Sequence, residues 1–226
     1  MNIMTKHYIN GDWVASVDGS GMAVVNPSTE EQIAKISLGG PADTDAAVAA
    51  AKAAFPGWAA TEPQERIAAL ERLLEAYKGR AKDTAQAISQ EMGAPIALAN
   101  TAQVGAGAGH LKNTIRAARS FAFEHPLGDH APGDMIFHEP VGVCALITPW
   151  NWPMNQVMLK VAPALAAGCT MVLKPAEQAP LSAMLLAEMI DEAGFPPGVF
   201  NLVNGHGAGV GSALTAHPDV DMVSFT

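Results

Sequence analysis

Apolar positions over residues 7–37 come in short groups that are separated by turn residues. Asn10-Gly11 and Asn26-Pro27-Ser28 are typical turn sequences, and the apolar groups beside them are too short for helices. We therefore expect short strands and hairpins at the start of the chain. This region shows no functional motif.

From Pro41 the pattern changes to that of helices. A first, alanine-rich helix begins there, and a second should begin near Pro63. Two further helical stretches are predicted over residues 81–91 and 95–120. The second helix has one apolar face, formed by residues at three- and four-residue steps: Ile67, Leu70, Leu73, Leu74 and Tyr77.

From Val141 onward apolar segments and amphipathic segments alternate regularly. This order implies a parallel sheet with right-handed crossovers. The strand interiors ALIT and TMVL are almost continuously apolar, as in a sheet that helices cover on both faces. Strands are predicted over residues 141–148, 170–174, 199–203 and 222–226, and helices over 152–167, 181–193 and 208–216.

The charge balance excludes some classes of partner. The chain has 13 Lys and Arg against 22 Asp and Glu, so it offers no basic face for nucleic acid. No apolar run approaches the length of a membrane span, and the first residues lack the layout of a signal peptide. We expect no membrane partner and a cytoplasmic location.

Two cysteines, Cys144 and Cys169, lie within apolar sequence. A catalytic thiolate needs partial exposure and electropositive neighbours, which neither surrounding sequence suggests. We predict two buried thiols and no disulfide.

Residues 121–140 are rich in proline, glycine and histidine, and predict an excursion from the main domain with a strand at 135–137. Its three histidines, His125, His130 and His138, are spaced by five and eight residues, which fits no common metal-ligand motif. We interpret them as solvated loop histidines and predict no metal site.

A glycine-alanine run at Gly105–Gly109 resembles a phosphate-binding loop only superficially. No predicted strand precedes it, and His110 stands where the third glycine of the dinucleotide motif belongs. Close packing between helices is the better interpretation.

Unusual residues cluster directly after the strands of the second half. The three segments are Pro149–Pro153, Lys174–Glu177 and Asn204–Gly211. Loops at the carboxyl ends of parallel strands converge on one edge of the sheet, where ligands bind. These segments predict a single site.

Lys174 and Glu177 could hold the two hydroxyls of a ribose, or they could form a surface ion pair. Their position at a strand end favours the ligand. A carboxylate at Glu177 would repel a 2′-phosphate, so NAD is favoured over NADP.

The glycines at 205, 207 and 211 depart from the dinucleotide fingerprint and follow the third strand instead of the first. They allow either close approach of the backbone to a cofactor or a tight turn. Asn151, between two tryptophans, predicts either a rigid, buried amide that stabilises an oxyanion or a cap of the next helix.

Taken together, several segments of the chain resemble the aldehyde dehydrogenase superfamily. In the second half they are ITPWNWPMNQVMLKVAPALAAGCTMVLKPAEQAP, EAGFPPGVFNLVNGHGAGVG and DVDMVSFT, and nearer the start they are YINGDWV, NPSTEEQIA and EMGAP. The resemblance spans almost the whole chain. It implies an α/β fold, a Rossmann-like parallel sheet with helices on both faces, preceded by short strands and a helical region. It also implies attack of a thiolate on an aldehyde, hydride transfer to a nicotinamide and hydrolysis of the thioester.

The resemblance assigns roles to individual residues. Asn151 matches the oxyanion donor and Lys160 a proton-relay lysine. Trp152, Gln156 and Leu159 match residues of the aldehyde channel. Cofactor-binding positions are Ile147, Thr148, Pro149, Trp150, Lys174, Pro175, Ala176, Glu177, Gly207, Gly211, Phe225 and Thr226.

By the same resemblance, residues 1–120 and 141–226 form an NAD-binding domain, and residues 121–140 match an oligomerisation hairpin, which suggests a homo-oligomer. The family continues beyond the FT sequence into a second domain that carries the nucleophilic cysteine. We therefore expect this chain to be a truncated piece that is inactive alone. The alternative is a non-catalytic nucleotide-binding module or pseudoenzyme.

Overall fold

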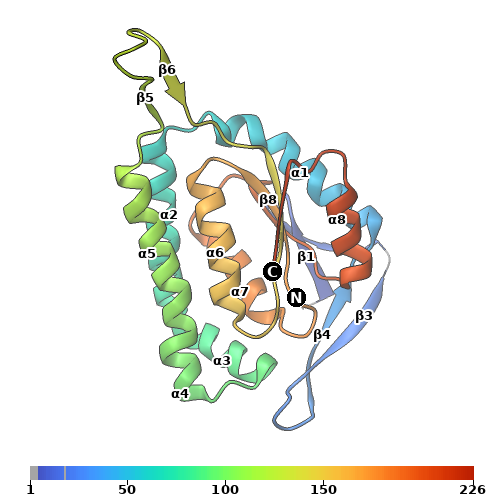
Figure 1. Cartoon of the computed structure of the whole chain (residues 1–226). Coiled ribbons are helices and arrows are strands. Elements are labelled where there is room, and N and C mark those ends of the chain that lie inside the picture. Colours follow the sequence, from blue (N-terminus) through green and yellow to red (C-terminus); the bar gives the residue numbers. More distant parts are fainter. Residues whose placement is uncertain (1–4, 18) are drawn as a thin grey trace.

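A six-stranded sheet forms the centre of the molecule in the computed structural model, which describes residues 5–17 and 19–226 (Figure 1). The strand order is β10-β7-β8-β9-β1-β2. The first four strands in that order are parallel, and β1 and β2 join them as an antiparallel hairpin. The bounds are β1 Lys6–Ile9, β2 Asp12–Ala15, β7 Val143–Ile147, β8 Thr170–Lys174, β9 Phe200–Leu202 and β10 Met222–Phe225.

Helices cover both faces of the sheet, as the continuously apolar strands predicted. Along β7, Cys144 and Leu146 pack into one core, whereas Val143 and Ala145 pack into another. This division follows from the two-residue period of a strand, which points successive side chains to opposite faces. α6 Pro153–Ala166 and α7 Leu181–Glu192 lie on the first face, and α1 Pro41–Ala59 and α8 Ser212–Ala216 on the second.

Three long helices from the first half of the chain form a further layer outside α6 and α7 (Figure 1). They are α2 Pro63–Gly79, α3 Ala81–Met92 and α5 Val104–Ser120. The single stretch predicted over 95–120 is divided, because the short α4 Ile96–Leu98 and a π-helical turn at Ala99–Gln103 precede α5. Within α5, a side chain at Gly107 would collide with the Tyr77 hydroxyl, which confirms close helix packing for this member of the glycine run.

Two hairpins lie outside the central sheet. β3 Ser20–Val25 pairs with β4 Gln32–Leu38, and β5 Glu124–Pro126 pairs with β6 Met135–Phe137. The β5–β6 hairpin projects beyond the body of the molecule, which accounts for the unusual composition of residues 121–140 (Figure 1). Within the described ranges, no helix has the length and apolar character that spanning a bilayer requires.

Candidate nucleotide site at the strand ends

The parallel strands end at a common level. Ile147, the last residue of β7, is the register partner of both Phe225 in β10 and Lys174 in β8. Beyond the strands, the Thr148 N–H donates to the Lys174 carbonyl over 3.2 Å, and the Thr226 N–H donates to the Ile147 carbonyl over 3.3 Å. The loops that follow therefore leave from one edge of the sheet, as the sequence predicted.

Lys174 is the buried centre of this edge, with a relative exposure of 3%. Its Nζ donates to the carbonyls of Pro175 and Gly205 over 2.9 and 2.8 Å and to Glu177 Oε2 over 3.1 Å. All three ammonium donors are thus used, and they tie the second loop to the third. The two residues therefore form the ion pair of the alternative interpretation, but its lysine is buried instead of lying at the surface.

Glu177 forms the outer end of the same network. Its side chain is 19% exposed, and Oε1 lies 3.3 Å from Nδ1 of His206, which sequence reasoning did not single out. Burial by itself raises the pKa of Glu177, but hydrogen bonding by its own backbone N–H and the charge of Lys174 outweigh burial, so the pKa is lowered. A partly exposed, ionised carboxylate therefore faces solvent at the strand ends.

The third loop runs into a π-helical turn at Gly207–Gly211 before α8 begins, so the helix predicted over 208–216 is regular only from Ser212. At Gly207 and Gly209 an added Cβ would meet no atom within 4 Å, so the backbone lies open there. Gly211 is different, since its Cβ position lies 3.8 Å from Lys174 Cδ and 4.0 Å from Ile147 Cδ1. The segment Gly207–Gly211 therefore starts with an open backbone and ends in contact with the Lys174 side chain.

Asn151 does not occupy the environment that the sequence predicted. Its side chain is exposed instead of buried, and the cap position of α6 is Trp152, without a side-chain capping hydrogen bond. The predicted burial and the helix cap are therefore wrong for this structure, whereas the oxyanion role of Asn151 stays a prediction. The loop projects outward, since the neighbouring Trp150 is 54% exposed.

Lys160 lies on α6 beside the edge strand. Its Nζ donates to Ser224 Oγ of β10 over 2.9 Å, and burial lowers its pKa. It borders a cavity of about 330 Å³ together with Cys144 and Cys169. The lysine is therefore placed on the α6 face of the sheet, next to the strand ends.

The two cysteines are free and buried, as predicted. The neighbouring Cys144 thiol and the backbone N–H groups of Val141 and Gly142 lower the pKa of Cys169 against the effect of burial. The charge of Arg66 acts in the same direction. An electropositive neighbour is thus present, contrary to the sequence interpretation, but the thiols remain enclosed.

The remaining predicted cofactor residues lie at the same edge of the sheet as Lys174. Two buried polar atoms at the same edge, Thr148 Oγ1 and Asn204 Oδ1, lack a hydrogen-bond partner within residues 5–17 and 19–226. Such atoms are typical of positions that a ligand or water completes. Ile147, Thr148, Pro175 and Ala176 are buried, Pro149 is half-buried, and Phe225 and Thr226 are exposed.

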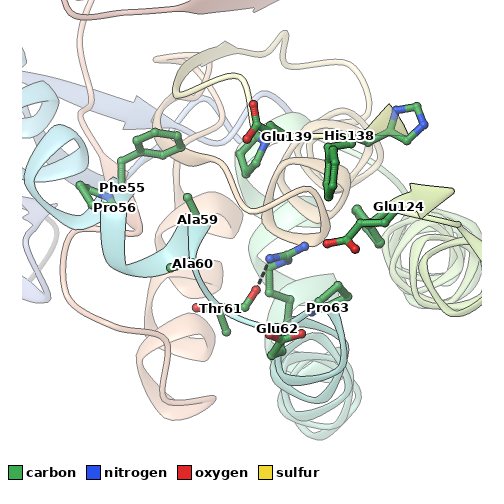
Figure 2. Close-up of a pocket in the computed structure, with 14 residues that line it drawn as sticks. Phe55, Pro56, Ala59, Ala60, Thr61, Glu62, Pro63, Glu124, His138 and Glu139 are labelled. Atoms are coloured by element: carbon green, nitrogen blue, oxygen red, sulfur yellow. Dashed lines mark hydrogen bonds between the residues drawn. The ribbon is translucent and has the colours of Figure 1, made fainter. Parts of the chain in front are cut away.

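A larger cavity, of about 560 Å³, lies elsewhere, between the end of α1, the start of α2 and the base of the β5–β6 hairpin (Figure 2). Arg66 forms part of its wall, donating to the Thr61 carbonyl, with its guanidinium carbon 5.3 Å from the centre of the Phe123 ring. None of the predicted site residues lines this cavity. The strand-end edge is therefore the better candidate for the nucleotide.

Comparison with known proteins decides the family. Residues 13–226 match the aldehyde dehydrogenase family. The chain belongs to this family. It is 52% identical over 222 residues to a 3-succinoylsemialdehyde-pyridine dehydrogenase from a Pseudomonas species, a match that covers 98% of this chain and 46% of that protein.

Solved aldehyde dehydrogenases and related enzymes share the fold. A mutant of aldehyde dehydrogenase C from Pseudomonas syringae, complexed with NAD+ and octanal, aligns with a TM-score of 0.95 and 51% identity over 99% of this chain and 45% of that one. An NADP-dependent enzyme from E. coli aligns with a TM-score of 0.92 and 36% identity over 99% and 47% of the two chains. The chain therefore spans about half the length of the relatives it matches.

Proposed function

We propose that the chain is the NAD-binding part of an enzyme that oxidises an aldehyde to a carboxylic acid. The observation that carries this proposal is the buried Lys174, which joins two strand-end loops and presents Glu177 at the surface of a family fold. When bound, NAD+ supplies the acceptor for the hydride of the aldehyde. The complex of the P. syringae relative with NAD+ and octanal supports the same pair of ligands.

The donor and acceptor groups at this edge fit a dinucleotide. The ionised Glu177 can accept hydrogen bonds from ribose hydroxyls, and a ribose hydroxyl can replace one of the three acceptors that Lys174 Nζ now contacts. The open backbone at Gly207 allows close approach of the cofactor. The proposed cofactor surface is completed by Ile147 to Trp150, Pro175, Ala176, Gly211, Phe225 and Thr226.

Two residues are proposed to act on the aldehyde side. The exposed Asn151 amide can donate to a developing oxyanion, because it is not engaged in capping α6. Lys160, whose pKa burial lowers, can exchange a proton more readily than a fully solvated lysine. Neither cysteine can attack an aldehyde while it is enclosed in the core. We therefore propose that residues 1–226 by themselves bind the cofactor but have no dehydrogenase activity.

The proposal extends to the organisation of the chain. Residues 1–120 and 141–226 would constitute the NAD-binding domain, and the projecting hairpin of residues 121–140 would serve oligomerisation. A hairpin that extends beyond the body offers strand edges for pairing with another chain. We propose a homo-oligomer on this basis.

Calorimetric titration of the purified chain with NAD+ tests the site. We expect Lys174→Ala and Glu177→Ala each to weaken NAD+ binding by about tenfold or more, provided circular dichroism shows that the variants fold. The matched control is the exposed Lys78–Glu75 pair on α2, which has the same three-residue spacing. Substituting either of its members by alanine should leave affinity unchanged.

NADP+ provides a second comparison in the same experiment. The Glu177 carboxylate should repel a 2′-phosphate, so we expect weaker binding of NADP+ than of NAD+, and a smaller gap in Glu177→Gln. Equal effects of Glu177→Gln on both nucleotides would contradict this assignment. A folded wild-type chain that binds neither nucleotide would show that the site needs residues from outside this chain. In a separate activity assay, dehydrogenase activity of the chain alone would refute the proposed lack of a nucleophile.

A further inference from the structure

Two histidines meet on the projecting hairpin. His125 in β5 is the register partner of Ile136 in β6, and His138 follows two positions later, so both side chains point to one face of the hairpin. Their Nε2 atoms lie 3.3 Å apart, with ring centroids separated by 5.4 Å. Strand pairing thus juxtaposes residues that are 13 positions apart in the sequence.

The His125 ring is oriented by a second hydrogen bond. Its Nδ1 lies 3.0 Å from the Pro126 carbonyl, which can only accept, so Nδ1 carries the hydrogen. In the neutral ring Nε2 then holds a lone pair, and that lone pair faces His138. Metal-binding histidines are typically fixed in this way, with the other ring nitrogen donating to a carbonyl.

The His138 ring is supported from the other side. It packs edge-to-face on Phe121, with centroids 5.1 Å apart, and Phe121 packs in turn on Phe123. The start of β5 and the end of β6 are also joined by the His138 N–H, which donates to the Phe123 carbonyl over 2.8 Å. The aromatic contacts and this backbone bond hold the second imidazole in place.

The distance between the two Nε2 atoms suits a shared metal ion. Two metal–nitrogen bonds of about 2.0–2.1 Å that meet at a tetrahedral angle place their nitrogens about 3.3–3.4 Å apart. We propose that His125 and His138 form a two-histidine site for a late divalent transition metal ion, of the class of Zn²⁺, Ni²⁺ and Cu²⁺. No cluster of three or more His, Cys, Asp or Glu ligands occurs in the described part of the chain, so water would fill the other coordination positions.

The competing explanation is a hydrogen bond between the rings. In that case the Nε2–H of His138 donates to the lone pair of His125, and the pair needs no metal. A metal ion would take the place of this proton, which would move to Nδ1 of His138 as the ring changes tautomer and frees its Nε2 lone pair.

Titration calorimetry with Ni²⁺ and with Zn²⁺, on chain purified without a polyhistidine tag, tests the site. We expect one ion per chain, with affinity reduced by about tenfold or more in both His125→Gln and His138→Gln. Substitutions on this exposed hairpin should change stability by less than about 0.5 kcal/mol, so the variants will fold. An electron paramagnetic resonance spectrum with Cu²⁺ should show coupling to two nitrogens in the wild type and to one nitrogen in either variant, since each variant keeps a single imidazole of the pair.

Two controls separate this site from others in the chain. His130→Gln removes the third histidine of the same hairpin and should leave affinity unchanged. A Cys144→Ala, Cys169→Ala double variant tests binding by the buried thiols and should also bind normally. Absence of binding to the wild-type chain, or binding that survives in both His125→Gln and His138→Gln, would overturn the proposal.

Discussion

A buried carboxylate at Glu91 shows how a single residue connects distant elements. Glu91 in α3 accepts hydrogen bonds from the Leu181 N–H and from the N–H and hydroxyl of Ser182, at the start of α7. The acid thus satisfies backbone donors that a helix leaves unpaired at its first turn. Burial raises the pKa of Glu91 to about 7, against the effect of these donors.

This pKa predicts how stability depends on pH. The ordinary pKa of the group is 4.5, so the folded chain keeps a proton that the unfolded chain releases as the pH rises. The unfolding free energy should fall between about pH 4.5 and pH 7, by about 3 kcal/mol, and change no further through this group above pH 7. Urea denaturation at a series of pH values measures the effect.

The control for this prediction is Glu91→Gln, which cannot titrate. Its unfolding free energy should be lower than that of the wild type at pH 5, because the amide places a donor against backbone N–H groups. Its dependence on pH between 5 and 7 should be shallower. Equal slopes for both proteins would mean that another group carries the titration.

At this scale the sequence predicted that the strand-end residues lie at one edge of the sheet, but not the hydrogen bonds among them. Lys174 and Glu177 could be predicted because a charged pair directly after an apolar strand is unusual. The His206 contact could not, because it depends on how the third loop folds back to a residue 29 positions earlier in the sequence. Asn151 was placed wrongly, since flanking aromatic residues suggest burial, whereas this loop turns its side chains outward.

At the scale of elements, the glycines of α5 differ in whether they lie in a contact with another helix. A Cβ at Gly107 would collide with Tyr77 of α2, whereas the same atom at Gly109 would meet nothing within 4 Å. Gly107 therefore permits the close approach of two helices, and Gly109 only loosens its own helix. Periodicity predicted both helices, but the sequence alone could not show which glycine lies in the contact.

These two positions form a matched pair for mutation. Gly107→Ala should lower the unfolding free energy by about 1–3 kcal/mol, because the methyl group overpacks the contact with Tyr77. Gly109→Ala should raise it by up to about 1 kcal/mol through helix propensity. Chemical denaturation of the two variants measures both changes in unfolding free energy. Destabilisation by both substitutions would argue against a specific contact at Gly107.

At the scale of the whole molecule, Asn201 joins the first hairpin to the parallel sheet. Its Nδ2 donates to the carbonyls of Met171 and Gly198 over 3.1 and 2.8 Å, and its Oδ1 accepts from the Asn10 N–H over 2.9 Å. The residue is fully buried. The alternation of strands and helices predicted the parallel part of this sheet, but not that β1 would extend it, because antiparallel addition of a distant strand leaves no local pattern.

Asn201→Ala should therefore destabilise the whole fold. Three hydrogen bonds are lost and backbone groups are left unpaired in the core, so we expect the unfolding free energy to fall by about 2–3 kcal/mol. Asn113→Ala on the exposed face of α5 is the control and should change it by less than about 0.5 kcal/mol. A loss confined to the β1–β2 hairpin in hydrogen exchange, with global stability unchanged, would contradict the prediction.

The place of β1 in the sheet also has a consequence for folding kinetics. Asn10 bonds to a residue 191 positions later, so the sheet cannot close until β9 has been synthesised. Contacts between such distant residues slow folding, because the entropy of closing the loop is lost before the contact contributes energy. During translation the amino-terminal hairpin would therefore stay unpaired at one edge until β9 has left the ribosome, and an unpaired strand edge of this kind is prone to aggregation.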